Sequence, residues 1–374
     1  MKLNRALEKL LKEMVKRDAS DLFLTAGAIP SMKIRGRLLQ VGRQALSPPD
    51  VQTLIDSVMP ERLSADFAAQ HEVNFAFAPD GLSRFRANAF FQRNSPGMVI
   101  RQIRAQVPSL EKLGLPAIAG ELALEQRGIV FVVGATGSGK STTLASMIQQ
   151  RNQFGSGHIV TVEDPIEYLH KHGNCIITQR EVGVDTDSFE AALENTLRQA
   201  PDCIVIGEIR SREAMQQAIT FAETGHLCLA TLHANTANQA LERILHFFPK
   251  EEHDRVRMDL AMNLKGIIGQ QLLPTPTRDQ LVLATEILFN SPLIADKIRN
   301  GELHEIRSLM ARSATIGMQT FDQALFTLYQ RGLIRYEEAL KHANSINDLR
   351  LQIKLAQGIK RTGHSRLETQ GFAE

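Results

Sequence analysis

Apolar residues follow two different patterns along the chain, and the change comes near Pro108. In the first hundred residues the apolar runs are short and separated by turn residues, and residues 99–103 alternate and predict a strand. Residues 47–59 predict a helix with Ser47 as its N-cap. Apolar positions within residues 3–15 recur at helical spacing among basic residues, which favours an amphipathic helix packed on its own domain over one lying on a membrane. These elements predict a small α+β domain.

After Pro108, continuous apolar runs alternate with helical patterns. Runs without polar alternation are typical of strands that are buried on both faces. We therefore expect a parallel sheet that is covered by helices on both sides. The candidate strands are residues 129–133, 159–162, 203–206, 227–230 and 281–287.

The pattern changes again towards the end of the chain. Residues 293–349 are helical in pattern and more polar, and no periodicity remains from Gly358 onward. Leu113-Gly114-Leu115-Pro116 has the composition of a hinge or linker. The predicted organisation is an N-terminal domain at 1–108, a linker at 109–116, an α/β domain with C-terminal helices at 117–357, and a flexible tail at 358–374.

The segment Gly134–Ser141 fits the phosphate-binding loop G-x-x-x-x-G-K-[ST] at every fixed position. It follows an apolar strand and precedes a helical pattern, a context that a chance glycine-rich turn would lack. In such a loop, backbone N–H groups and the helix N-terminus hold phosphates. We expect Lys140 to reach the β- and γ-phosphates, Ser141 to ligate Mg²⁺, and Thr142 to donate near the α-phosphate. The predicted nucleotide-binding residues are Gly134, Thr136, Gly137, Ser138, Gly139, Lys140, Ser141 and Thr142.

Hydrolysis of a triphosphate also needs carboxylates near the γ-phosphate. Glu163 and Glu208 each follow a buried strand, at the edge where open α/β sheets bind ligands. Either one alone could be an ordinary cap or turn residue, but two of them after a phosphate loop favour a catalytic role. His233 could sense the γ-phosphate or be a structural histidine. A zinc site of His226, Cys228 and His233 is disfavoured because a second ligand pair is missing.

Composition narrows the classes of function. The 374 residues carry 43 Lys+Arg against 41 Asp+Glu, so a strongly basic protein that coats polyanions is excluded. Tryptophan is absent and tyrosine is rare, which disfavours an aromatic groove for single-stranded nucleic acid. Three cysteines do not make a disulfide framework, and they fit a reducing cytoplasm. No run reaches the ~18 apolar residues that a membrane span needs.

Four motifs, taken in their order along the chain, resemble those of the secretion-type ATPases that power type IV pili and type II secretion. They are a Walker A loop at 134–141, an Asp box at 161–167, an atypical Walker B motif at 204–210 and a His box at 224–233. Further matches at 19–22, 84–86, 179–183 and 317–322 extend the resemblance over nearly the whole chain.

Within that family the chain resembles the type IV pilus retraction ATPases of the PilT/PilU branch, and most of all the PilU type. Assembly and secretion members carry a tetracysteine zinc insertion after the His box, whereas residues 271–276 continue here without one. Residues 211–213 and 230–235 also resemble the PilU type. At 293–300 the retraction motif of PilT proteins is not kept, which implies an accessory motor that works beside PilT.

The resemblance implies a fold and a set of partners. It implies a RecA-like P-loop ATPase domain with a smaller PAS-like α+β N-terminal domain, assembled as a homohexamer that hydrolyses ATP with Mg²⁺. Arg86 and Arg101 match arginine sensors that reach the phosphates, so the implied catalytic set is Glu208, Glu163, His233, Arg86 and Arg101, with Ser141 and Glu208 at the Mg²⁺.

The implied setting is the pilus machine. The protein would be cytoplasmic and peripheral, at the inner-membrane base of that machine. Its partners would be a PilT-like ATPase and an inner-membrane platform protein. It would bind no nucleic acid and would meet the membrane only through the machine.

Three other functions stay open. An assembly or type II secretion ATPase of the same family is disfavoured by the missing tetracysteine. A RecA-like nucleic-acid motor is disfavoured by the near-neutral charge and the few aromatic residues. A nucleotide-binding scaffold that does not hydrolyse ATP is disfavoured, though not excluded, by Glu163, Glu208 and His233.

Overall fold

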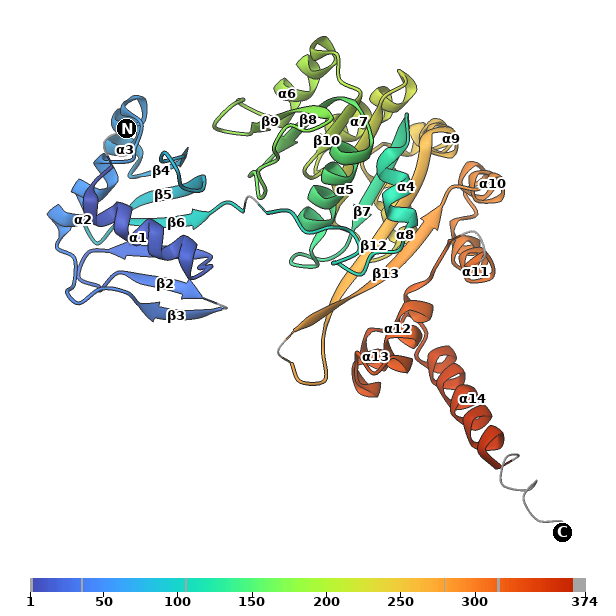
Figure 1. Ribbon diagram of the computed structural model, residues 1–374. Coiled ribbons are helices and arrows are strands. Elements are labelled where there is room, and N and C mark those ends of the chain that lie inside the picture. The colour runs from blue at the N-terminus through green and yellow to red at the C-terminus, as the bar shows by residue number, and fades with distance from the viewer. Residues whose placement is uncertain (1–2, 35, 105, 279, 315–316, 366–374) are drawn as a thin grey trace. The chain divides into compact units, whose positions relative to one another are not determined.

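The computed structural model of the chain describes residues 3–34, 36–104, 106–278, 280–314 and 317–365 (Figure 1). The chain forms two compact units. The first runs to Val107 and also contains Pro165–His170 and Arg180–Ser188, and the second contains the remainder from Pro108. The predicted linker at 109–116 therefore lies in the second unit, where Leu110 and Leu115 are buried in the core.

The first unit is built on a six-stranded antiparallel sheet with the order β3-β2-β1-β6-β5-β4. The predicted N-terminal helix and the helix capped by Ser47 are both present. The elements are α1 (Arg5–Lys16), β1 (Asp21–Thr25), β2 (Ser31–Ile34), β3 (Arg37–Gln40), α2 (Pro48–Asp56), a 3₁₀ turn (Glu61–Leu63), α3 (Ser64–Gln70), β4 (Glu72–Phe77), β5 (Phe85–Gln92) and β6 (Ser95–Gln102).

Only one face of this sheet carries the core of the unit. Leu7, Leu11 and Met14 of α1 are fully buried with alternate strand residues such as Leu22 and Ile100. Since successive side chains of a strand point to opposite faces, the intervening positions lie on the other face of the sheet. Arg86 of β5 and Arg101 of β6 lie on that second face.

The second unit is built on a seven-stranded sheet with the order β13-β12-β7-β11-β10-β8-β9. The strands are β7 (Gly128–Val133), β8 (Gly157–Glu163), β9 (Cys175–Glu181), β10 (Cys203–Ile206), β11 (Leu227–Leu232), β12 (Leu264–Pro274) and β13 (Leu281–Phe289). The run from β12 through β8 is parallel, but β13 is antiparallel to β12. The expectation of a wholly parallel sheet is therefore corrected to a mixed sheet in which the edge strand β13 is antiparallel.

Helices cover this sheet on both faces, as expected (Figure 1). Val130 and Val132 of β7 pack with α4 and α5, while α7 contacts β7 and β11. All six residues of β7 and of β11 are buried. The helices are α4 (Ile118–Leu124), α5 (Lys140–Phe154), α6 (Phe189–Thr196), α7 (Arg212–Glu223), α8 (Ala237–His246) and α9 (His253–Asn263), with 3₁₀ turns at Leu197–Gln199 and Lys250–Glu252.

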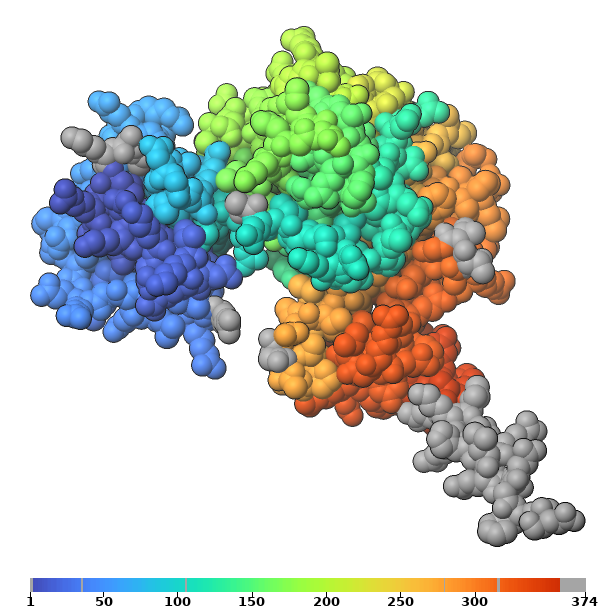
Figure 2. Space-filling view, viewed as in Figure 1, coloured from blue at the N-terminus to red at the C-terminus, as the bar shows by residue number. Residues whose placement is uncertain are grey.

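The C-terminal helices add a further core to the second unit. Phe321, Leu325, Leu349 and Ile353 are buried together against the β12–β13 hairpin. The elements are α10 (Pro292–Asn300), a 3₁₀ turn (Leu303–Glu305), α11 (Ile306–Arg312), α12 (Phe321–Gln330), α13 (Tyr336–His342) and α14 (Ile346–Ser365). Figure 2 shows their surface in orange and red.

Helix α14 extends through residues 358–365 of the predicted tail at 358–374, because the polar residues there are still compatible with a helix. Residues 366–374 lie outside the described residues. In the described part of the chain, no helix combines the length and the apolar character needed to cross a bilayer.

Candidate nucleotide site

The loop Gly134–Ser141 joins β7 to α5, as the sequence predicts. Gly137 and Gly139 have φ angles of 79° and 91°, a region that only glycine adopts without strain. A Cβ on Gly134 would lie 2.3 Å from Ser138 Oγ, so this position also needs glycine. Thr136 and Gly137 are exposed at the crest of the loop and Ser141 is exposed in the first turn of α5. Thr142 is half-buried. This is the cradle that binding of phosphates requires.

Lys140 is 9% exposed and lies within the loop that precedes it. Its Nζ donates to the carbonyl oxygens of Gly134 and Ala135, at 2.9 and 3.1 Å. Nζ also lies 3.4 Å from Nδ1 of His233. Burial lowers the pKa of Lys140, and the nearby carboxylate of Glu208 opposes that shift. The two loop carbonyls and the His233 ring therefore hold the ammonium group of Lys140 beside the loop.

His233 connects this lysine to Glu208. Its Nε2 lies 2.7 Å from Oε1 of Glu208, whose side chain is only 17% exposed. Burial, and then the charge of Lys140, lower the pKa of His233, so its ring is neutral at pH 7. A neutral ring meets both contacts only when Nε2 carries the proton, because it then donates to Glu208 and accepts from Lys140 at Nδ1. Lys140, His233 and Glu208 therefore form one continuous network.

Glu208 is also fixed from its other side. Arg210 Nη2 donates to Glu208 Oε2 at 2.7 Å, and Arg210 Nη1 lies 3.5 Å from Asp164 Oδ2. The hydrogen bond to Glu208 raises the pKa of Arg210. Thr231 Oγ1 donates to the carbonyl oxygen of Gly207 at 2.6 Å and so ties the end of β11 to the segment that carries Glu208. Both carboxylate oxygens of Glu208 are therefore oriented.

Glu163 ends strand β8, next to β10 in the sheet. Its Oε1 accepts hydrogen bonds from Thr161 Oγ1 at 2.7 Å and from Gln179 Nε2 at 3.1 Å. A Cβ on Gly207 would lie 3.2 Å from the Cα of Glu163, so the backbones that carry the two predicted carboxylates are adjacent. The carboxyl ends of neighbouring strands thus bring Glu163 and Glu208 to the same edge, as expected.

A cleft of about 450 Å³ opens beside the loop. Gly134 and Ala135 of the loop, His233 and residues of α8 line it. Arg243 of α8 lines the cleft, and its charge further lowers the pKa of His233. The remaining lining residues are Ala234, Asn235, Gln239, Glu242, His246 and Phe247.

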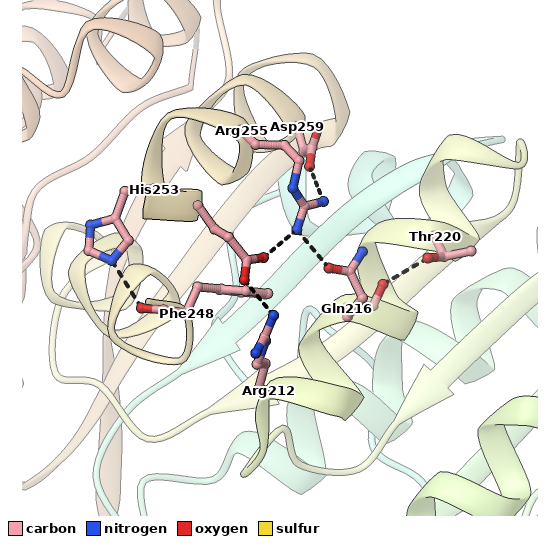
Figure 3. A network of polar contacts seen from close by, with 8 residues as sticks. Arg212, Gln216, Thr220, Phe248, His253, Arg255 and Asp259 are labelled. Atoms are coloured by element: carbon pink, nitrogen blue, oxygen red, sulfur yellow. Dashed lines mark hydrogen bonds and ion pairs between the residues drawn. The ribbon is translucent and has the colours of Figure 1, made fainter. Parts of the chain in front are cut away.

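A second polar network anchors the helix that follows Glu208 (Figure 3). Glu252 accepts from Arg212, the first residue of α7, at 2.5 Å and from Arg255 of α9 at 2.8 Å. Arg255 also donates to Gln216 at 3.1 Å and to Asp259 at 3.4 Å. The network fastens the start of α7 to α9, and so it limits the movement of the short segment between Glu208 and α7.

The donor set fits a magnesium ion that arrives with its nucleotide. Among the described residues, no group of three or more His, Cys, Asp or Glu side chains could hold a metal alone. Mg²⁺ in nucleotide sites is typically held by one or two protein oxygens and the phosphates. The exposed hydroxyl of Ser141 lies beside the loop, and Glu208 presents oriented carboxylate oxygens.

Arg86 and Arg101 belong to the first unit, whereas the phosphate loop belongs to the second. They lie directly opposite each other on β5 and β6. Asp21 pairs with Arg101 at 2.8 Å, and the charge of Arg86 opposes the rise in the pKa of buried Glu181. Like charges opposite each other in a sheet are unfavourable. The carboxylates of Asp21 and Glu181 offset this repulsion, and both arginines lie on the face of the sheet that lacks the core.

The sequence-based site and the observed one overlap but are not identical. The loop residues, Glu208 and His233 meet at one place as expected. Arg210 and Arg243 were given no role from sequence, although Arg210 lies within the Walker B match. A cation two residues after a strand-end glutamate was the available signal for Arg210. Arg243 had none, because its position depends on how α8 packs.

Comparisons with known proteins show the family of the chain. The family model for "Type II/IV secretion system protein" matches residues 1–286. The chain belongs to this family. PilU of Pseudomonas aeruginosa, a type IV pilus ATPase, is 60% identical over 348 residues, which cover 93% of this chain and 91% of PilU. PilT of the same organism, a type IV pilus retraction ATPase, is 38% identical over 337 residues, which cover 90% of this chain and 98% of PilT.

The structural comparison leads to the same group. A crystal structure of the pilus retraction motor PilT with bound ADP superimposes with a TM-score of 0.85 at 42% identity, covering 91% of this chain and 97% of that chain. The chain is thus a PilU-like member of the family, and the resemblance and the α/β fold class inferred from sequence are confirmed.

Proposed function

We propose that this protein is an ATP-hydrolysing motor of the PilU type that powers type IV pilus retraction. The observation that carries the proposal is the continuous network from Lys140 through His233 to Glu208 at the mouth of a phosphate loop. A scaffold that only binds nucleotide needs the loop but not an oriented carboxylate joined to it by a histidine. The 60% identity to PilU supports the assignment to this type.

The loop, helix α5 and Lys140 together hold the phosphates. Backbone N–H groups at the crest and the N-terminus of α5 hold the phosphates. Lys140 exchanges its bonds to the Gly134 and Ala135 carbonyls for phosphate oxygens, which are stronger acceptors because they are charged. The loop then surrounds the phosphates with donors that are already oriented.

The carboxylates act on the water. Glu208 orients the attacking water, with Glu163 as a second carboxylate at the same sheet edge. Neutral His233 keeps its Nε2–H hydrogen bond to Glu208. A change in the position of Lys140 therefore reaches Glu208 through this histidine. Bound Mg²⁺, held by Ser141 and Glu208, would neutralise charge on the phosphate oxygens. Arg86 and Arg101 supply further positive charge to the phosphates, for which the guanidinium group is suited.

The setting of the motor follows from its relatives. We expect a homohexamer at the cytoplasmic base of the inner-membrane pilus machine. It would work with a PilT-like ATPase and pass its motion to a platform protein of the inner membrane. It would touch the membrane only through that machine and would not need nucleic acid.

The first test is magnesium-dependent ATP hydrolysis by the purified full chain. Lys140→Ala and Glu208→Gln should each lower kcat/KM by about 100-fold or more, because each removes a group from the centre of the network. Glu223→Gln changes an exposed glutamate at the far end of α7 and should keep the wild-type rate. Equal rates in all four proteins would refute the motor and leave a scaffold.

The arginines are tested in the same assay. Arg86→Ala and Arg101→Ala should lower kcat about tenfold or more, since an arginine that stabilises the transition state contributes at least that much. Arg93→Ala, at the turn between β5 and β6, serves as the matched control. Wild-type rates in both sensor variants would remove the arginines from the mechanism.

A deletion strain separates retraction from assembly. Loss of the gene should abolish or weaken twitching while surface pili remain. If surface pili disappear instead, the protein is an assembly ATPase of the same family.

A further inference from the structure

We infer that Gln270, on the strand next to the phosphate loop, is a positioning residue that sets the shape of the loop. This inference rests on the proposed nucleotide binding at Gly134–Ser141. Gln270 is far from the loop in sequence and belongs to none of the four motifs.

Gln270 meets the loop twice. Strand β12 runs parallel to β7 with Gly269 opposite Val133, so Gln270 lies level with the first residue of the loop. Its side-chain Nε2 donates to the backbone carbonyl oxygen of Ser138 at 2.7 Å. Its own backbone carbonyl would lie 2.6 Å from a Cβ on Gly134. One residue of β12 therefore limits both the start and the middle of the loop.

The hydrogen bond has a clear consequence for the phosphate cradle. A peptide unit is planar, so fixing the carbonyl of Ser138 also fixes the direction of the Gly139 N–H group. That group belongs to the turn between Gly137 and Lys140, where both glycines are already in the left-handed region. Gln270 thus removes the remaining freedom of a segment whose N–H groups must converge on phosphate.

The burial of Gln270 argues against a role in stability alone. The residue is 1% exposed, and within the described part of the chain its Oε1 has no hydrogen-bond partner. The Oγ of Ser138 is also buried and without a partner there. A buried polar atom without a partner costs free energy, which an apolar side chain of similar size would avoid. The hydrogen bond to Ser138 must therefore offset the cost of burying Oε1.

The test is the variant Gln270→Met, which keeps the length and approximate volume of the side chain but removes the donor. Affinity for Mg·ADP is measured with a fluorescent N-methylanthraniloyl derivative, and the midpoint of thermal unfolding is measured without nucleotide. We expect Kd to rise about five- to tenfold, the value of one hydrogen bond, when the proteins are measured well below their unfolding midpoints. A merely structural residue would lower the midpoint and leave the Kd of the folded protein unchanged.

Gln271→Met is the matched control. Gln271 is the next residue of β12 and also has a buried Oε1 without a partner among the described residues, but its side chain points to the opposite face of the strand. It should leave Kd at the wild-type value. Gln270→Asn keeps the amide but is one methylene too short to reach Ser138, and it should show the same loss of affinity if Gln270→Met does not fold.

The outcomes separate this inference from the proposed function. A wild-type chain that does not bind the ADP derivative would remove the nucleotide site itself. A wild-type chain that binds, with an unchanged Kd in Gln270→Met or in Gln270→Asn, would overturn only the role of Gln270. A lower unfolding midpoint with an unchanged Kd in the folded protein would leave Gln270 a structural residue and overturn it as well.

Discussion

The two sheets of this chain differ in how many of their faces carry a core. In the seven-stranded sheet, Ile129 and Val130 are neighbours on β7, point to opposite faces and are both fully buried. In the six-stranded sheet, Ile100 is buried while its neighbour Val99 is only half-buried. A charged side chain in the middle of a strand that is buried on both sides costs free energy, whereas one at the end of the strand can reach solvent.

This difference decides where each unit can hold reactive groups. In the seven-stranded sheet, Glu163, Glu208 and His233 all lie at or just beyond strand ends. In the six-stranded sheet, Arg86 and Arg101 lie within strands, on the face without the core. The residues proposed for catalysis therefore lie along one edge of the covered sheet and across one face of the other sheet.

The comparison would fail most clearly if a buried charge were tolerated on either face of β7. Ile129→Asp and Val130→Asp should each lower the free energy of unfolding by more than about 4 kcal/mol, because each buries a carboxylate without a partner. On β6, Ile100→Asp should cost a similar amount, whereas Val99→Asp should cost less than about 1 kcal/mol. Urea unfolding followed by far-ultraviolet circular dichroism measures all four.

A smaller effect sharpens the same comparison through pH. Burial raises the pKa of Glu286, on β13 of the covered sheet, to about 7. The folded state then holds a proton more tightly than the unfolded state does, so stability should fall as pH rises from about 4.5 to 7. Over that range the loss is about 3 kcal/mol at most.

The variant Glu286→Gln isolates this contribution. Its amide oxygen can still accept from the backbone N–H of Ala237, which Glu286 Oε2 accepts at 2.7 Å. The variant should therefore match the wild type at pH 5 and be more stable at pH 8. Glu72→Gln, at an exposed position of the six-stranded sheet, should change neither value. Parallel pH profiles for wild type and Glu286→Gln would contradict the buried acid.

The sequence predicted the parts of the fold that leave a local pattern. The loop and β10 appear where expected, because a continuous apolar run and a fixed spacing of glycines both act over a few residues. Strands β9 and β12 were missed because polar residues such as Gln179 and Gln270 interrupt their apolar runs. The antiparallel place of β13 depends on a hairpin with β12 and could not follow from its own composition.

The same distinction holds for the site. Lys140, Glu208 and His233 could be named because each belongs to a short motif. Gln270 could not, since it meets Ser138 across 132 positions of the chain. Arg243 reaches the cleft only through the packing of α8. Residues that support a reactive group from a distant segment leave no periodic or motif signal of their own.

The separate core of α12, α13 and α14 has a consequence for how the chain unfolds. It contacts the sheet mainly through the outer end of the β12–β13 hairpin, at residues such as Leu273 and Ala284. A group of helices that closes over its own apolar side chains forms a cooperative unit of its own. We therefore expect these helices to exchange their amide hydrogens with solvent faster than the central strands do.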